Sequence, residues 1–202
     1  MYVARTEDRA SFVEWVLEKV QADFGKSQRM KVLVKPNIVG LVFSLLIQLA
    51  LLEETVERAL EVLISKPRLS GHNYYIVGAD GKAYDVEVTA HHHAVEELTE
   101  GIFVHANHYH AQELRKSAID YSPTSEMREA SLRAYLEGRW PHPQISDFKV
   151  ALSIHEGGIC RHEEKNSTVC TCGALIFDPA NLTTCINQGY PCLSNWQEYS
   201  IE

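Results

Sequence analysis

The chain has 202 residues, 45% hydrophobic and 23% charged, which is typical of a soluble globular protein of one domain, or of one domain plus a fragment. Its formal net charge is -8 with the histidines counted as neutral. Because a nucleic-acid-binding surface needs lysines and arginines to displace the counterions of phosphates, this charge argues against a nucleic-acid partner.

The sequence disfavours both export and a membrane partner. Its start, MYVARTEDRASFVEWVLEKV, is charged and amphipathic, so we expect no signal peptide. The longest apolar stretch, residues 38–52, is shorter than the roughly 18–20 residues of a membrane span, and we interpret it as a buried strand and helix, with a membrane segment as the alternative. An odd number of cysteines without an export signal predicts reduced thiols and a cytoplasmic location. The cysteines are Cys160, Cys170, Cys172, Cys185 and Cys192.

The first third of the chain has helical hydrophobic periods. In residues 6–25 apolar side chains recur every four positions before Gly25, which predicts an amphipathic helix. Residues 31–36, KVLVKP, predict a short strand that ends at the proline. Residues 55–67 predict a second helix.

Further along, the hydrophobic period changes to two. Residues 73–90 predict a hairpin in which Asp80-Gly81 supplies the turn. Residues 101–110, GIFVHANHYH, predict a strand that runs into a loop. Two more strands, expected to pair with each other, are predicted in residues 167–179 and 182–192.

Two further helices are predicted between these strands. One covers residues 124–138, with Thr124 or Ser125 as its cap, and a shorter one covers residues 146–158 with Ser146 as its cap. Because hairpins and helices alternate without parallel βαβ units, the predicted fold class is α+β with mainly antiparallel sheet.

The histidines of FVHANHYH and the triplet at 91–93 raise the question of a metal site. On a strand, His105 and Asn107 would share one face and His108 would point to the other, so the two rings would not converge on a metal. No acidic or thiol partner is placed nearby in the sequence, and the triplet is expected in a solvated turn.

The cysteines offer a second candidate, in which Cys160 and His162 combine with Cys170 and Cys172. Zinc knuckles usually place two or more residues between paired cysteines, so we favour Cys170 and Cys172 as small core residues of a strand. We therefore predict no metal and no other cofactor. The alternative is a zinc-binding module that uses His105, His108, Cys160 or the Cys170–Cys172 pair.

Several motifs after residue 50 occur in an order and spacing that resemble the isopenicillin-N acyltransferase family, a branch of the N-terminal-nucleophile hydrolases. They are Asn73-Tyr74, Asp80-Gly81, Val86-Glu87, HANH at 105–108, ICRH at 159–162 and GYPC at 189–192. The resemblance implies part of a four-layer αββα sandwich, and a reaction of amide hydrolysis or acyl transfer on a small amide or thioester substrate.

In that family a self-cleaved chain exposes an N-terminal cysteine, whose thiolate attacks a carbonyl carbon. Asn107 matches the family's asparagine, which helps to hold the oxyanion, and Arg161 matches an active-site arginine of related hydrolases. By this resemblance Asn107 and Arg161 are the predicted catalytic residues. The alternative is structural: Asn107 capping a turn and Arg161 in an ion pair.

The family's nucleophile has no counterpart in this sequence, because no cysteine precedes Cys160. Cys170-Thr171 imitates the motif but follows a valine inside a predicted strand, while Thr6 and Ser11 lie in or beside a predicted helix. We therefore predict a truncated acyltransferase-like protein that is inactive alone. The alternative is one subunit of a split hydrolase, completed in trans by a nucleophile-bearing partner chain or in a homo-oligomer.

Residues 1–40 do not resemble the acyltransferase family. They are similar to the start of an uncharacterised family often linked to iron–sulfur proteins, but no C-x-x-C motif accompanies them, so no cluster is expected. We expect residues 1–40 to be an unrelated N-terminal fragment of helix plus strand. Residues 41–202 are then the C-terminal portion of the acyltransferase-like domain.

Overall fold

The structure is a computed structural model that describes residues 3–8, 40–116, 123–163 and 169–200. The chain divides into two compact units. The first unit contains residues 34–129 and 179–181. The second contains residues 2–33, 130–178 and 182–202.

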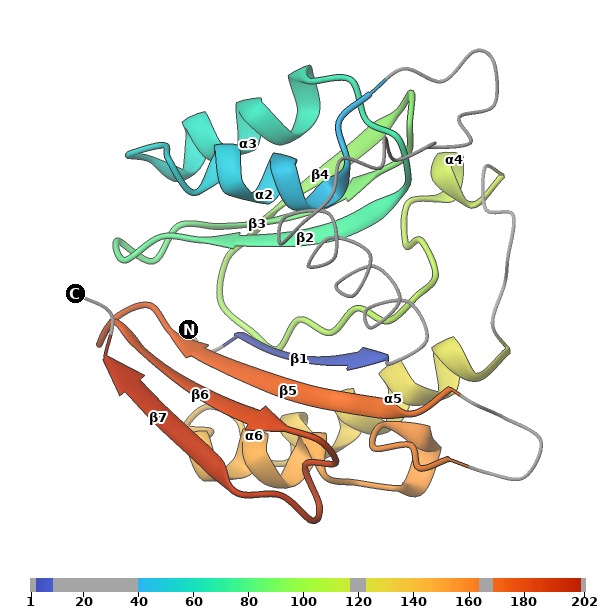
Figure 1. Ribbon diagram of the computed structural model, residues 1–202, viewed down its shortest axis with the longest axis vertical. Coiled ribbons are helices and arrows are strands. Elements are labelled where there is room, and N and C mark those ends of the chain that lie inside the picture. Colours follow the sequence, from blue (N-terminus) through green and yellow to red (C-terminus); the bar gives the residue numbers. More distant parts are fainter. Residues whose placement is uncertain (1–2, 9–39, 117–122, 164–168, 201–202) are drawn as a thin grey trace, which may run out of the picture. The chain divides into compact units, whose positions relative to one another are not determined.

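The first unit is a three-stranded antiparallel sheet with helices packed on it (Figure 1). Strand β2 (His72–Val77), strand β3 (Ala83–Val88) and strand β4 (His93–Leu98) lie in that order. Helix α2 (Phe43–Ala50) and helix α3 (Val56–Ser65) cover one face. The short helix α4 (Gln112–Arg115) follows, and then helix α5 (Pro123–Glu137), which continues into the second unit.

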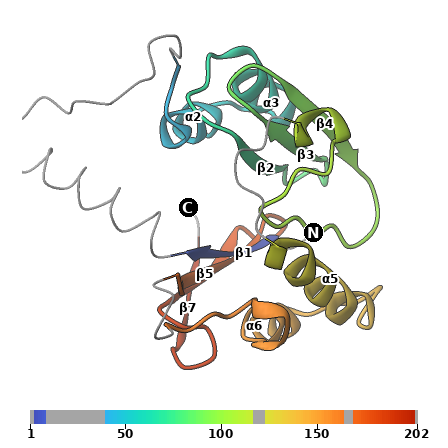
Figure 2. The same ribbon diagram turned by 90° about the vertical axis from the view of Figure 1, so that its right-hand side faces the viewer.

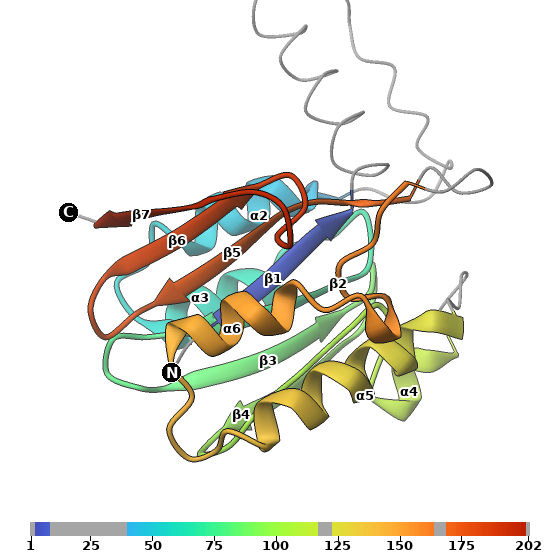
Figure 3. The same ribbon diagram turned by 90° about the horizontal axis from the view of Figure 1, so that it is seen from below.

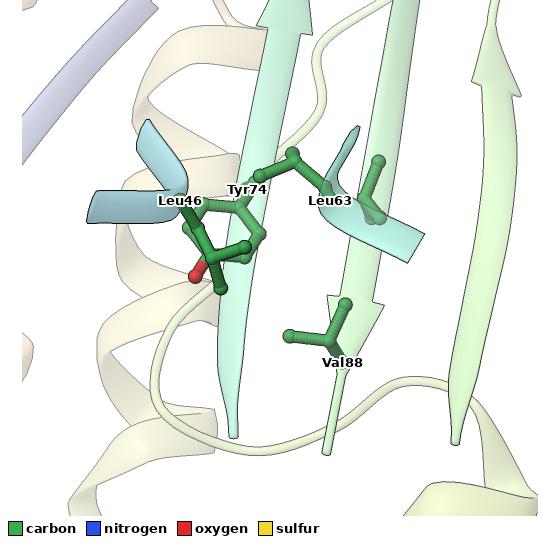
Figure 4. Close-up of a cluster of buried hydrophobic side chains, with 5 residues drawn as sticks. Leu46, Leu63, Tyr74 and Val88 are labelled. Atoms are coloured by element: carbon green, nitrogen blue, oxygen red, sulfur yellow. The ribbon is translucent and has the colours of Figure 1, made fainter. Parts of the chain in front are cut away.

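The core of this unit lies between the two helices and the sheet, as Figure 4 shows. Its buried side chains come from α2, α3, β2 and β3, and they are Leu46, Leu63, Tyr74, Val86 and Val88. Tyr74 and Val86 are direct cross-strand partners in the β2–β3 register. The tight turn between these strands depends on Gly81, which has a φ of 87° that a side chain would disfavour.

The second unit is a four-stranded antiparallel sheet in the order β1-β5-β6-β7. Its strands are β1 (Val3–Asp8), β5 (Thr171–Asp178), β6 (Thr183–Gln188) and β7 (Trp196–Ser200). Helix α6 (Ile145–Leu152) lies against β1 and β5, on one face of the sheet (Figure 2 and Figure 3). Phe148, Ala151 and Leu152 are its buried residues. A 3-10 turn, η1 (Glu156–Gly158), follows α6.

The α+β class with antiparallel sheets is confirmed, and each unit is a sheet with helices, as a partial αββα sandwich would contain. The hairpin of residues 73–90 is confirmed, as is the pairing of β5 with β6. The helices predicted at 55–67 and 124–138 are present as α3 and α5, and the apolar stretch 38–52 contains α2. None of the helices in the part of the chain that the structure describes combines the length and apolar character of a membrane span.

Several predictions about local structure were wrong. Residues 6–8 belong to β1 and not to a helix, because they pair with β5. Residues 101–110 form a loop and not a strand, and they follow β4. The solvated turn predicted for the histidine triplet is present at His91 and His92, which are exposed, while His93 is the first residue of β4. The helix predicted at 146–158 ends at Leu152, and Gln144 caps it instead of Ser146. Residues 9–25 and 31–36 lie outside the described residues.

Candidate functional site

A buried carboxylate, Glu87, organises the loop of residues 105–111 in the first unit. Glu87 lies near the end of β3 with its side chain 6% exposed. One carboxylate oxygen accepts hydrogen bonds from His105 Nε2 at 2.7 Å and from the backbone N–H of His110 at 2.5 Å. The other accepts from the backbone N–H of Ala111 at 2.7 Å. One side chain therefore holds both ends of the loop.

His105 is arranged to carry a positive charge. Its Nε2 donates to Glu87, and its Nδ1 lies 2.8 Å from the carbonyl oxygen of Ala106, so both ring nitrogens face acceptors. Burial by itself lowers the pKa of His105, but these hydrogen bonds and the nearby carboxylates outweigh it and raise the pKa above its usual value. Burial likewise works to raise the pKa of Glu87, and the three donors outweigh it and lower that pKa.

Asn107 stands at the exposed tip of this loop, and α5 fixes it. Its backbone N–H donates to Ser125 Oγ at 2.8 Å. Arg128, one turn further along α5, donates to the Asn107 side-chain oxygen Oδ1. With Oδ1 accepting from a guanidinium, the amide nitrogen is the end of the side chain that can donate to a developing oxyanion.

Ser125 is fully buried, and it does not cap α5, because the helix already begins at Pro123. The same start excludes Thr124 as the cap, and Thr124 instead accepts a hydrogen bond from Arg128 at 2.8 Å. The Ser125 hydroxyl also lies 2.8 Å from His108 Nδ1. Because His108 Nε2 faces the Glu129 carboxylate at 3.6 Å, we assign the ring proton to Nε2, and the Ser125 hydroxyl then donates to Nδ1. Burial is the largest influence on His108 and lowers its pKa, in keeping with a neutral ring.

The histidines converge, contrary to the prediction from a strand. The ring centres of His105 and His110 lie 4.3 Å apart, and those of His108 and His110 lie 5.3 Å apart. An acidic partner is also present, because Glu129 accepts from His110 Nε2 at 2.8 Å and lies 3.6 Å from His108 Nε2. The prediction missed Glu129 because it is a distant residue on α5 that only the tertiary fold brings to the loop.

Two sets of these side chains have the spacing of metal ligands: Asp85, His105 and His110, and His108, His110 and Glu129. However, the ring nitrogens of His105 donate to Glu87 and Ala106, and His110 Nε2 bonds Glu129. We therefore interpret the group as a hydrogen-bonded network that supports Asn107. Asp85 belongs to its buried edge, where it accepts from Asn73; burial raises the pKa of Asp85.

The family motifs of the first hairpin lie next to each other in this arrangement. Asn73 faces Glu87 across the β2–β3 ladder, and Tyr74 faces Val86. Asn73 and Glu87 lie on the polar face of the hairpin and take part in the hydrogen-bonded network. Tyr74 and Val86 lie on the opposite face, in the hydrophobic core.

Arg161 lies in the second unit, between Cys160 and His162. Its backbone N–H donates to Thr171 Oγ1 at 3.0 Å, and its carbonyl oxygen accepts from the Thr171 N–H at 2.9 Å. Thr171 is buried at the start of β5, so the sheet fixes the backbone of Arg161. Asn107 and Arg161 thus belong to different units of the chain.

The two antiparallel sheets with their helices define a mixed α+β protein, and the supported asparagine gives its first unit a group suited to stabilising an anion. Residues 36–191 match the family described as acyl-coenzyme A:6-aminopenicillanic acid acyl-transferase. This match covers roughly three quarters of the chain, and the chain belongs to that family. A search of curated proteins gives no match.

Proposed function

We propose that this chain is part of an acyltransferase-like protein of the N-terminal-nucleophile hydrolase type, whose family reaction takes a small amide or thioester as substrate. The observation that carries the proposal is the fixed orientation of Asn107, whose Oδ1 accepts from Arg128 while its backbone is bonded to Ser125. Asn107 supplies the oxyanion donor, and Arg161 supplies a positive charge for the thiolate or the substrate. The proposed location is the cytoplasm.

The chemistry requires a donor that is in place before the reaction begins. When a thiolate attacks a carbonyl carbon, negative charge develops on the carbonyl oxygen, and a preoriented N–H stabilises it without reorganisation. One such donor typically contributes about 2.7–4 kcal/mol, or roughly 100- to 1000-fold in rate.

We further propose that the chain is inactive alone and truncated relative to an active domain, because it contains no cysteine before Cys160. Cys170 and Thr171, which imitate the family's nucleophile motif, are each 1% exposed at the start of β5. A side chain buried there cannot reach a substrate or become a new N-terminus without disrupting the sheet. This burial supports the view that Cys170 is a core residue.

The second candidate is a subunit of a split hydrolase in which another chain, or a second copy of this one, supplies the nucleophile. The observation that favours it is the exposure of Asn107 together with the hydrogen bonds that hold its loop in place. A loop that is ordered in this way retains its geometry for a nucleophile provided in trans.

The proposal is tested with chromogenic amides and acyl thioesters. We expect no turnover by the purified chain. If the chain is a subunit of a split hydrolase, turnover should appear when fractions of the host cell extract are added. This reconstituted turnover should fall roughly 100- to 1000-fold for Asn107→Ala. It should be unchanged for Asn195→Ala, which removes an exposed amide in the second unit.

Two results would count against these ideas. Turnover by the purified chain that depends on Asn107 would show that the chain is active alone. Reconstituted turnover that is indifferent to Asn107→Ala would remove the asparagine from the mechanism. If no fraction restores turnover, the split-enzyme candidate fails and the inactive, truncated form stands.

A further inference from the structure

We propose that the second unit binds a structural zinc ion through His155, Cys160, His162 and Cys192. These four side chains each offer one nitrogen or sulfur atom, and all four atoms lie within 4.8 Å of one another. They belong to two segments that are far apart in sequence, residues 155–162 and residues 190–194. The proposal is independent of the acyl-transfer chemistry.

The separations between the atoms fit a tetrahedral ion. Zinc bonds of about 2.3 Å to sulfur and about 2.05 Å to nitrogen place two sulfurs about 3.8 Å apart and a sulfur and a nitrogen about 3.6 Å apart. The Sγ atoms of Cys160 and Cys192 are 3.6 Å apart. His162 Nε2 lies 3.9 Å from the Cys160 sulfur and 3.1 Å from the Cys192 sulfur. His155 Nε2 lies 3.2 Å from the Cys192 sulfur.

The backbone holds the first segment in a shape that brings its three ligands together. Gly157 and Gly158 both have φ of 75°, which glycine adopts without strain, and they reverse the chain between His155 and Cys160. The N–H of Cys160 donates to the carbonyl oxygen of Ile154 at 2.8 Å and closes this loop. The pairing of Arg161 with Thr171 then directs residues 160 and 162 from a fixed backbone.

The second segment presents Cys192 from a turn. The N–H groups of Leu193 and Ser194 both donate to the carbonyl oxygen of Tyr190 at 2.9 Å. The Tyr190 ring also stacks on the His162 ring, with centres 4.0 Å apart and an angle of 14° between the planes. This stacking fixes the orientation of a ligand ring.

The choice of zinc follows from the donors. Two thiolates and two imidazoles in a tetrahedral arrangement suit Zn²⁺, whereas carboxylate and water ligands would suit Mg²⁺ or Ca²⁺. Four protein ligands form a closed coordination shell, which is the pattern of a structural site. On binding, the two thiols release their protons to solvent as the sulfurs bond the metal.

The test is metal analysis of the full chain, purified with a thiol reductant and without chelators. We expect one equivalent of zinc per chain, and X-ray absorption should show two sulfur and two nitrogen neighbours. After the zinc is removed with a chelator, added Co²⁺ should produce the visible absorption bands of a tetrahedral thiolate site. Cys192→Ser and His155→Ala should each weaken zinc binding by roughly 100-fold or more, since losing even an outer partner commonly costs 10- to 100-fold.

His155→Ala guards against loss of folding, because His155 is exposed and its removal leaves no cavity. Cys172→Ser is the matched control and should retain zinc, because Cys172 lies on β5 outside the ligand group. The proposal is overturned if the reduced wild-type chain binds no zinc, or if Cys172→Ser loses zinc as readily as Cys192→Ser. Recovery of a Cys160–Cys192 disulfide that persists under the same reductant would also overturn it.

Discussion

Replacing Glu87 by alanine should release the loop that carries Asn107. The change removes the acceptor for the ring of His105, which is 4% exposed, and for the backbone N–H groups of His110 and Ala111. Leaving one partner of a buried ion pair without its counter-charge typically costs about 3–5 kcal/mol. Leaving a buried N–H without a partner costs about 1–3 kcal/mol. Because the loop can open and let water reach these donors, we expect about 3–5 kcal/mol in total for Glu87→Ala.

The assay is native-state hydrogen exchange, read at the amides of His110 and Ala111. A cost of about 3–5 kcal/mol corresponds to exchange that is faster by about two to four orders of magnitude at these amides. Glu97→Ala, on the exposed side of β4, is the control and should change stability by no more than about 0.5 kcal/mol. If the amides of His110 and Ala111 exchange at the same rate in both variants, Glu87 does not hold the loop.

Three further predictions concern the surroundings of this network. The pKa of His105 is raised and that of Glu87 is lowered, so their pair stabilises the fold fully between the unfolded carboxyl value near 4.5 and the unfolded imidazole value near 6.5. That contribution is lost as pH rises through the His105 pKa or falls through the Glu87 pKa, so His105→Gln should lower the melting temperature more at about pH 5.5 than at about pH 9. Gly71→Ala should destabilise the fold by about 1–3 kcal/mol in urea unfolding, because its Cβ would overlap the Tyr109 hydroxyl oxygen. Leu46→Ala should cost about 2–5 kcal/mol, because Leu46 is 1% exposed in the core.

Each of these changes has a matched control. For His105→Gln the control is Asn195→Gln, an exposed substitution whose effect on the melting temperature should be the same at the two pH values. For Gly71→Ala the control is Gly138→Ala, where an added Cβ would meet its nearest neighbour at 3.6 Å. For Leu46→Ala it is Leu51→Ala, because Leu51 is 78% exposed. A variant that behaves like its control would contradict the corresponding prediction.

Local chemistry made part of the fold predictable. Asp80-Gly81 fixes a tight turn whatever surrounds it, so the hairpin of β2 and β3 could be predicted from the sequence. The loop at 101–110 could not, because its alternating pattern resembles a strand while Glu87 takes up its backbone N–H groups. Strand β4 was missed for the opposite reason: its sequence, HAVEEL, is mostly exposed and lacks a continuous apolar face.

For the cysteines and histidines of the second unit, too, the sequence did not predict which side chains the fold brings together. Proximity in sequence suggested that Cys160 and His162 would join Cys170 and Cys172. The fold instead brings Cys192 to them across 30 residues, through a turn that spacing alone does not predict. His155 reaches the group of Cys160, His162 and Cys192 because two successive glycines with positive φ, Gly157 and Gly158, fold the chain back.

The histidines around Asn107 belong to the hydrogen-bonded network that holds its loop in place. Ordering a backbone residue costs about 1–2 kcal/mol, and a loop that was ordered only on substrate binding would subtract this from catalysis. Here Glu87 holds the loop at both ends and Ser125 holds its middle. The loop is therefore ordered when the chain folds, before any substrate binds. Glu87→Gln leaves Asn107 chemically intact, but it should still reduce reconstituted turnover. We expect it to lower kcat more than it raises KM. An unchanged kcat would mean that Asn107 does not depend on its loop.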